Sequence, residues 1–324
     1  MRQRIFIVSS SPHIFATESI PGIMYHVVFA LSPVVAASVY FFGIRALLLL
    51  IVCVSGAILS EHASQILRHK KTTIGDGSAL ITGMLLALVL PPAFPLWAAF
   101  LGAMVAIIAG KMIFGGLGYN VFNPALIGRA FLQAAFPVLI TQWSQPEFSF
   151  APTIPIVTQA TPLAAFKFQG QLTGYWQLFW GHVGGSLGET SALAILIGGL
   201  YLVRKKYADW RIISGIFLSA GLFSGVLWLI RPEQYASPVF HFLSGGFLLG
   251  TFFMATDMVT SPITPAGRWI FGAGVGFFII LIRSFGGLPE GVMYAILLMN
   301  ALTPLIDRFT KPRILGRKKK AWSN

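Results

Sequence analysis

The sequence contains few charged residues, and acidic ones are especially scarce. Only 10% of its 324 residues are charged, and 10 Asp and Glu stand against 23 Lys and Arg. Hydrophobic residues make up 56% of the chain and the mean hydropathy is +0.77, values outside the range of soluble globular domains. The composition therefore predicts an integral membrane protein. It argues against a nucleic-acid partner, because the basic residues stand in short clusters between apolar runs, as topology signals do.

Cysteine and recognisable cofactor fingerprints are also lacking. Cys53 is the single cysteine and lies in an apolar run, which excludes an intrachain disulfide framework and a thiolate metal site within this chain. The histidines show no ligand spacing, so no metal site is expected. The chain has no nicotinamide-binding fingerprint. Its first twenty residues lack the apolar core of a cleaved signal peptide, so we expect the first membrane helix to direct insertion.

Ten apolar segments have lengths suited to crossing a membrane, some of them as broken helices. The second five start roughly 170 residues after their counterparts, and at that offset Met84 matches Met254 and Pro92 matches Pro262. An odd number of spans per repeat inverts the second copy. We therefore expect an all-α membrane protein of about ten transmembrane helices in two inverted five-helix repeats. The segments are 23–42, 44–60, 79–92, 95–113, 121–139, 190–203, 211–230, 239–255, 268–284 and 289–306.

The distribution of Lys and Arg indicates the orientation. With a cytoplasmic N-terminus, 18 of the 23 lie on the inner side, Arg129 lies within the fifth segment, and only Arg45, Lys167, Arg231 and Arg283 lie outside. Such an imbalance favours two cytoplasmic termini and an extracytoplasmic central interval. The expected organisation is a first five-helix repeat at 1–139, an extracytoplasmic loop at 140–189, and a second repeat with a basic cytoplasmic tail at 190–324.

Two segments in matching positions of the two halves are interrupted. The third ends in the double proline Pro91-Pro92, and its counterpart runs into "ATDMVTSPITPAGR" with Asp257 at the edge of the bilayer. Broken helices expose backbone groups to a ligand, so such a pair points to a binding site near the membrane midplane. Asp257 either caps a turn or meets a cation or a cofactor there.

Four separated motifs follow one another along the chain: "GDGSALITGMLLALVLPP" (75–92), "GGLGYNVFNPALIGRAFL" (115–132), "QATPLA" (159–164) and "TDMVTSPITPAGR" (256–268). Together they resemble the family of the D subunit of the Rnf complex, shared with the B subunit of the sodium-pumping NADH:quinone reductase. The resemblance implies a membrane electron-transfer subunit of an ion-translocating ferredoxin:NAD oxidoreductase, which is not catalytic alone. It implies other Rnf subunits, a flavin transferase, membrane lipid, and a sodium ion or proton as partners, in the cytoplasmic (inner) membrane of a bacterium or archaeon.

In that family a threonine carries flavin mononucleotide (FMN) through a phosphoester bond, in a motif written Ser-Gly-Ala-Thr. The matching position is Thr161, preceded by Ala160, while Thr158 and Gln159 depart from the motif. From the residues alone, Thr161 followed by Pro162 is an ordinary helix start. The two interpretations are compatible, because the free amides and dipole of a helix N-terminus favour phosphate oxygens.

The resemblance also implies a second, non-covalent flavin, riboflavin, near "GYNVFNPAL". The side-chain amides of Asn120 and Asn123 suit the edge of a flavin ring, although Asn-Pro is also an ordinary turn or helix start. Two other classes of function remain open on the same sequence. One is a small-solute channel, since the family resembles urea- and ammonium-channel architecture, and the other is a purely structural membrane anchor. Detection of covalently bound flavin would distinguish an electron carrier from both a channel and an anchor.

Overall fold

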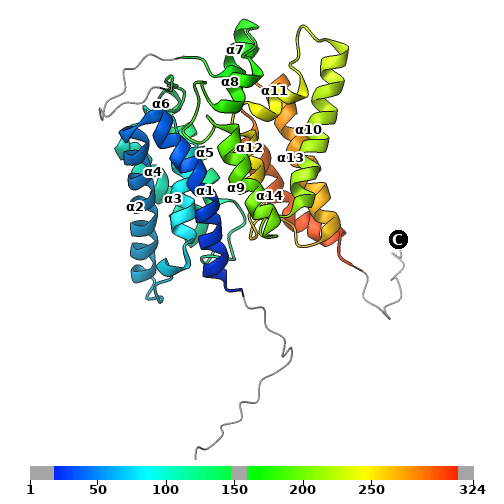
Figure 1. The fold of residues 1–324 in the computed structure, drawn as a ribbon. Helices are drawn as coiled ribbons and strands as arrows, with labels where there is room; N and C mark the ends of the chain where they lie inside the picture. The colour runs from blue at the N-terminus through cyan, green and yellow to red at the C-terminus, as the bar shows by residue number, and fades with distance from the viewer. Residues whose placement is uncertain (1–17, 147–158, 313–324) are drawn as a thin grey trace, which may run out of the picture.

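The computed structural model describes residues 18–146 and 159–312, and all regular structure within these residues is helical (Figure 1). Five helices in this part of the chain are long and apolar enough to cross a membrane, and three shorter apolar helices accompany them. The prediction of an all-α membrane protein is confirmed. The long helices are α1 (Ile20–Phe42), α2 (Ile44–Leu67), α10 (Trp210–Ile230), α13 (Pro265–Phe285) and α14 (Val292–Phe309), and the shorter ones are α3 (Ser78–Leu88), α9 (Ala192–Arg204) and the stretch Leu96–Met112.

The remaining elements are short or continue a neighbouring helix. The stretch Leu96–Met112 consists of an α-helix followed by one wider π-helical turn, and a second π-helical turn occurs in the other half of the chain. These elements are η1 (Ile74–Asp76), α4 (Leu96–Ile107), η2 (Ile108–Met112), α5 (Pro124–Ala135), α6 (Pro137–Ile140), α7 (Pro162–Gln169), α8 (Tyr175–Trp180), α11 (Pro238–Leu243), α12 (Phe247–Leu249) and η3 (Gly250–Met254).

The two interrupted segments are broken helices. Helix α3 ends at Leu88, just before Pro91-Pro92, because proline cannot continue a helix. In the second half the helix breaks at 244–246, where Gly245 adopts a φ of 61° that favours glycine, and η3 then ends at Met254. The first of these breaks follows from the prolines, whereas the break at Gly245 was not predicted.

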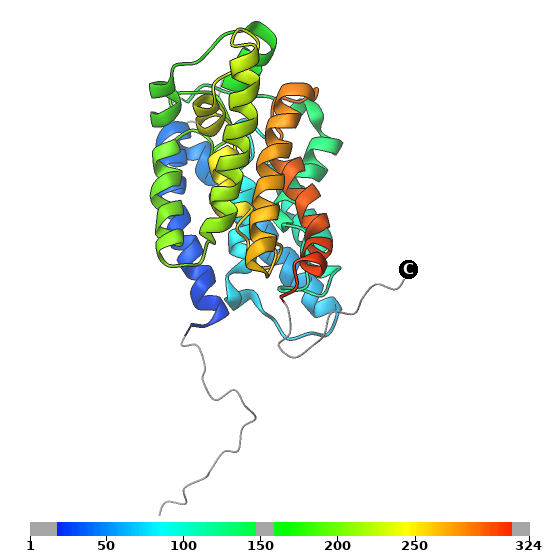
Figure 2. The same cartoon turned by 90° about the vertical axis from the view of Figure 1, so that its right-hand side faces the viewer.

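Three helices of the first half and three of the second are packed in the same order. Helix α2 packs on α4 as α10 packs on α13, and α4 packs on α5 as α13 packs on α14. Figure 2 shows α10, α13 and α14 side by side. Glycine allows a close approach where α9 packs on α1: a Cβ on Gly198 of α9 would lie 1.9 Å from the carbonyl oxygen of Ala30 in α1.

The two ends of the bundle differ in character. Helices α6, α7, α8 and α11 lie at the upper end in Figure 1. The lower end holds the start of α1, the end of α2, the turn between α9 and α10, and the end of α14. The functional candidates Thr161 and Asn120 belong to opposite ends, because Thr161 begins α7 and Asn120 lies in the lower loop before α5.

Candidate functional site

Thr161 caps the N-terminus of helix α7. Its backbone is extended, its Oγ1 accepts a hydrogen bond from the backbone N–H of Ala164 at 3.2 Å, and Pro162 is the first helical residue. The predicted helix start is therefore confirmed. Thr161 is only 7% exposed, whereas Ala160 beside it is exposed. The other predicted member of this motif, Thr158, lies outside the described residues.

A polar cavity of about 510 Å³ opens beside the Thr161 cap. Ala160 and Pro162, the two chain neighbours of Thr161, both line it. The rest of its wall is rich in amide groups, which donate and accept hydrogen bonds without carrying charge. These side chains are Gln145, Gln159, Gln171 and Gln177, with His182 next to them.

A buried ionic cluster lies on the other side of Thr161, and Glu189 and Glu290 line a small cavity together with Thr161. Arg129 of α5 pairs with Glu290, and its Nη1 lies 3.7 Å from the Glu189 carboxylate. The same guanidinium donates to the carbonyl of Val89, just beyond the broken end of α3, at 2.8 Å. A cation within a membrane segment needs an anionic partner, and the two carboxylates supply it for Arg129. Sequence reasoning missed both glutamates.

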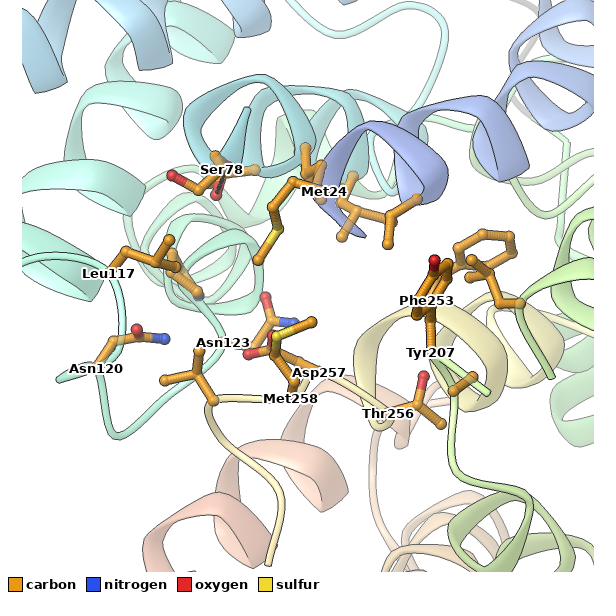
Figure 3. A pocket seen from close by; sticks show the side chains of 18 of the residues that line it. Met24, Ser78, Leu117, Asn120, Asn123, Tyr207, Phe253, Thr256, Asp257 and Met258 are labelled. Atoms are coloured by element: carbon orange, nitrogen blue, oxygen red, sulfur yellow. Dashed lines mark hydrogen bonds between the residues drawn. The ribbon is translucent and has the colours of Figure 1, made fainter. Parts of the chain in front are cut away.

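Asn120, Asn123 and Asp257 come together on the wall of a cavity toward the opposite end of the bundle (Figure 3). Asn120 and Asn123 come from the loop before α5 and its cap, whereas Asp257 comes from the segment after η3, far from them in the sequence. Figure 3 also shows Ser78 and Tyr207 at this cavity. Three of the predicted site residues therefore form one cavity wall.

The hydrogen bonds of these three residues differ. The Oδ1 of Asn123 accepts from the N–H groups of Ala125 and Leu126, and its Nδ2 donates to the carbonyl of Met254 at 3.3 Å. Asn123 is thus the cap of α5 and ties it to η3. Asp257 accepts from the hydroxyl of Thr260 at 3.1 Å, as a turn cap would.

Asn120 differs from the other two because one of its polar atoms has no partner. Its Nδ2 donates to the carbonyl of Phe122 at 3.2 Å, whereas its Oδ1 is buried and accepts no hydrogen bond within the described part of the chain. A buried acceptor without a donor is costly, so this oxygen is suited to a bound molecule with an N–H or O–H group.

A buried ion pair stands at the edge of the same cavity. The ammonium of Lys111 lies 2.7 Å from the carboxylate of Glu61, and both side chains are almost completely buried. Lys111 also donates to the hydroxyl of Ser78, and Glu61 accepts from Gln65 and Thr73. Sequence reasoning did not single out this pair, although Glu61 is the lone acidic residue of the otherwise apolar helix α2.

The helices and the cavities toward the two ends define the class: a multi-pass, all-helical membrane protein with candidate ligand sites toward both ends. Residues 7–316 match the model of the NQR2, RnfD, RnfE family, and the chain belongs to that family.

Relatives match over nearly the full length. The chain is 43% identical to the D subunit of the proton-translocating ferredoxin:NAD(+) oxidoreductase complex of Clostridium ljungdahlii, over 98% of both chains. It is 44% identical to the D subunit of the Na(+)-translocating complex of Acetobacterium woodii, over 98% of this chain and 97% of the relative. The D subunit of an ion-translocating oxidoreductase complex of Stutzerimonas stutzeri is 40% identical over 93% of each chain. The expected family is confirmed.

Proposed function

We propose that this chain is the membrane electron-carrying subunit of an ion-translocating ferredoxin:NAD+ oxidoreductase complex, with FMN attached covalently to Thr161. The family and the full-length similarity to named D subunits support the complex. The chain has one cysteine and no nicotinamide fingerprint, so it exchanges electrons with ferredoxin and NAD only through the other subunits. The ion moved by the complex is a proton or a sodium ion, the two ions named for the relatives.

The proposed architecture has ten membrane segments in two inverted repeats, 1–139 and 190–324, joined by the flavin-bearing interval 140–189. Its support is the matching packing of α2 on α4 and α10 on α13, together with the two broken helices in corresponding positions. The end of the bundle that carries most Lys and Arg is the cytoplasmic end under this proposal, with both termini. Thr161 then faces the extracytoplasmic side.

The observation that carries the FMN assignment is the Thr161 cap beside the amide-lined cavity. A transferase would catalyse attack of the Thr161 oxygen on the FMN phosphorus of a flavin dinucleotide, with loss of the hydroxyl proton to a base and departure of the adenosine monophosphate. The free amides of α7 favour the resulting phosphodiester. The amides of Gln159 and Gln177 suit the ring edge and ribityl hydroxyls, and the bound flavin supplies the redox chemistry.

The cavity at the other end is the proposed site of riboflavin, held without a covalent bond. The unpartnered Oδ1 of Asn120 fits the N–H of a flavin ring. Asn123 and Asp257 shape the wall beside it through their own turn and cap hydrogen bonds. A cytoplasmic flavin and an extracytoplasmic flavin would give electrons a path from one end of the protein to the other.

Covalent flavin is the direct test. Protein made together with its flavin transferase should give a fluorescent band on a denaturing gel, and Thr161→Ala should abolish the band because no oxygen remains to carry the ester. Thr158→Ala is the matched control, since Thr158 serves recognition in this proposal and its loss should weaken labelling at most. A dark wild-type band with an active transferase present would remove the electron-carrier role and favour a small-solute channel.

The orientation has its own test. A reporter that works only in the cytoplasm should be active after residue 320 and inactive when inserted within 145–155. Activity at the second position would place the Thr161 interval inside and overturn the extracytoplasmic assignment of the flavin.

A further inference from the structure

A second cavity at the Thr161 end of the bundle is lined, within the described part of the chain, by basic side chains and by no acidic ones. It has a volume of about 210 Å³ and lies among α7, α11, the end of α13 and the loop between α10 and α11. It is separate from the amide-lined cavity, and the two share no lining residue. Its polar lining consists of Lys167, His241, Arg283, Gln234, Tyr235 and Ser284.

The two permanent cations of this cavity have no carboxylate partner. Neither Lys167 nor Arg283 belongs to an ion pair among the described residues. Arg283 is only 4% exposed, and its Nη1 and Nη2 donate to the carbonyls of His241 and Ser244. Glu290 and Glu189 are the acidic groups that act on its charge, and both pair with Arg129 instead. A buried cation without a close counter-ion is costly, so an anion in the cavity would stabilise it.

Two buried nitrogen atoms at this cavity have no hydrogen-bond partner within the described residues. They are the Nε of Arg283 and the Nδ1 of His241, and both side chains are more than nine-tenths buried. Buried polar atoms in folded proteins almost always have a partner. Both side chains line the cavity, and because the two atoms themselves have almost no accessible surface, a side-chain rotation would be needed to bring them to a ligand with acceptor oxygens.

Lys167 adds a second positive charge to the rim. Its ammonium donates to the carbonyls of Arg283 at 2.9 Å, Leu288 at 3.1 Å and Gly286, which holds it at the C-terminal end of α13 and uses all three of its N–H groups. Burial lowers the pKa of this ammonium below its usual value. An anion bound nearby would offset that effect, because an opposite charge favours the charged form of a lysine.

We propose that this cavity binds a phosphate-class anion through Arg283, His241 and Lys167. Phosphate oxygens match the combination of guanidinium, imidazole and ammonium groups with the hydroxyls of Tyr235 and Ser284. Phe285 and Leu288 are the chain neighbours of the lining residues Ser284 and Pro289, and at 60% and 40% exposure they provide apolar surface for acyl chains. The headgroup of an anionic phospholipid and free inorganic phosphate are the two sources of this chemistry.

The test is a binding titration on delipidated protein followed by native mass spectrometry, with phosphatidylglycerol, phosphatidylcholine and inorganic phosphate as separate probes. Wild-type protein should bind one phosphatidylglycerol or one phosphate per chain, and Lys167→Gln should weaken that binding about tenfold because one of the two positive charges at the cavity is lost. Selective binding of phosphatidylglycerol identifies the lipid headgroup, and binding of phosphate identifies the free anion. Phosphatidylcholine should bind more weakly than phosphatidylglycerol.

Two further variants separate a ligand site from a structural role. Ser284→Leu should block the cavity while leaving every cation in place. Arg45→Gln is the matched control, because Arg45 also donates only to backbone carbonyls, those of Pro92 and Phe94, and lies outside the cavity. Absence of binding to the folded wild type would overturn the proposal. Binding by Lys167→Gln and Ser284→Leu as tight as that of the wild type would also overturn it. The anion should still bind to the Thr161→Ala variant, so the result of this binding test does not depend on covalent flavin.

Discussion

The buried pair of Lys111 and Glu61 gives the sharpest prediction about stability. Lys111→Met removes the cation and leaves the Glu61 carboxylate in a site where it is 0% exposed. Removing one partner of a buried ion pair costs about 3 to 5 kcal/mol, since the other charge stays buried and unpaired. Glu61 keeps its hydrogen bonds from Gln65 and Thr73, so we expect the lower end of that range, about 3 kcal/mol.

The complementary variant should be as damaging. Glu61→Gln leaves the Lys111 ammonium with the Ser78 hydroxyl as its remaining side-chain partner, and again about 3 kcal/mol should be lost. The double variant has no buried charge at this site. We expect it to lose only about 1 to 2 kcal/mol, mainly through an unpaired amide group, which is far less than the sum of the two single losses.

The assay is reversible unfolding of the detergent-solubilised protein, followed by circular dichroism, for all four members of the double-mutant cycle. Arg211→Met serves as control, because the pair of Arg211 with Asp209 is partly exposed and Asp209 keeps Arg268. It should cost less than about 1 kcal/mol. Single variants as stable as the wild type, or a double variant that loses the full sum, would refute the reasoning.

Two further predictions concern helix packing and the cavity proposed to hold riboflavin. Gly198→Ala should destabilise the protein by roughly 1 to 3 kcal/mol, because the new Cβ would meet the Ala30 carbonyl. Gly287→Ala should be nearly neutral, since nothing lies within 4 Å of its Cβ. Thermal unfolding compares the stability of the two variants. Asn120→Ala and Asp257→Asn should impair electron transfer through the assembled complex while the covalent flavin remains. Normal turnover in both variants would show that these residues only stabilise a turn and a cap.

The sequence predicted best what depends on neighbouring residues. The apolar segments predicted the membrane helices, and Thr161 followed by Pro162 predicted the start of α7, because a cap hydroxyl and a proline act within one helical turn. The double proline likewise predicted that α3 stops early. In each case the residues that decide the structure lie next to it in the chain.

The ionic features could not be predicted because they depend on distant segments. Lys111 and Glu61 are 50 residues apart, and Arg129 and Glu290 are 161 residues apart, so each pair exists only once the helices have packed. The scarcity of acidic residues was nevertheless a usable signal. In a chain with only 10 Asp and Glu, an acid inside an apolar helix or beside a glycine-rich break needs a partner, and Glu61 and Glu189 both have one.

The burial of Thr161 bears on when the proposed flavin attachment would take place. Attack by a hydroxyl requires an accessible oxygen, yet Thr161 is 7% exposed and its Oγ1 already accepts the hydrogen bond that caps α7. A transferase needs that oxygen free, so attachment should precede the packing of this segment or require its local opening. Protein folded in the membrane without transferase, and then given transferase and flavin dinucleotide, should therefore become labelled far more slowly than protein that meets the transferase during synthesis. Replacing Pro162 by Gly should weaken the start of α7 and speed late labelling, and equal rates for early and late exposure would show that the packed cap is no barrier.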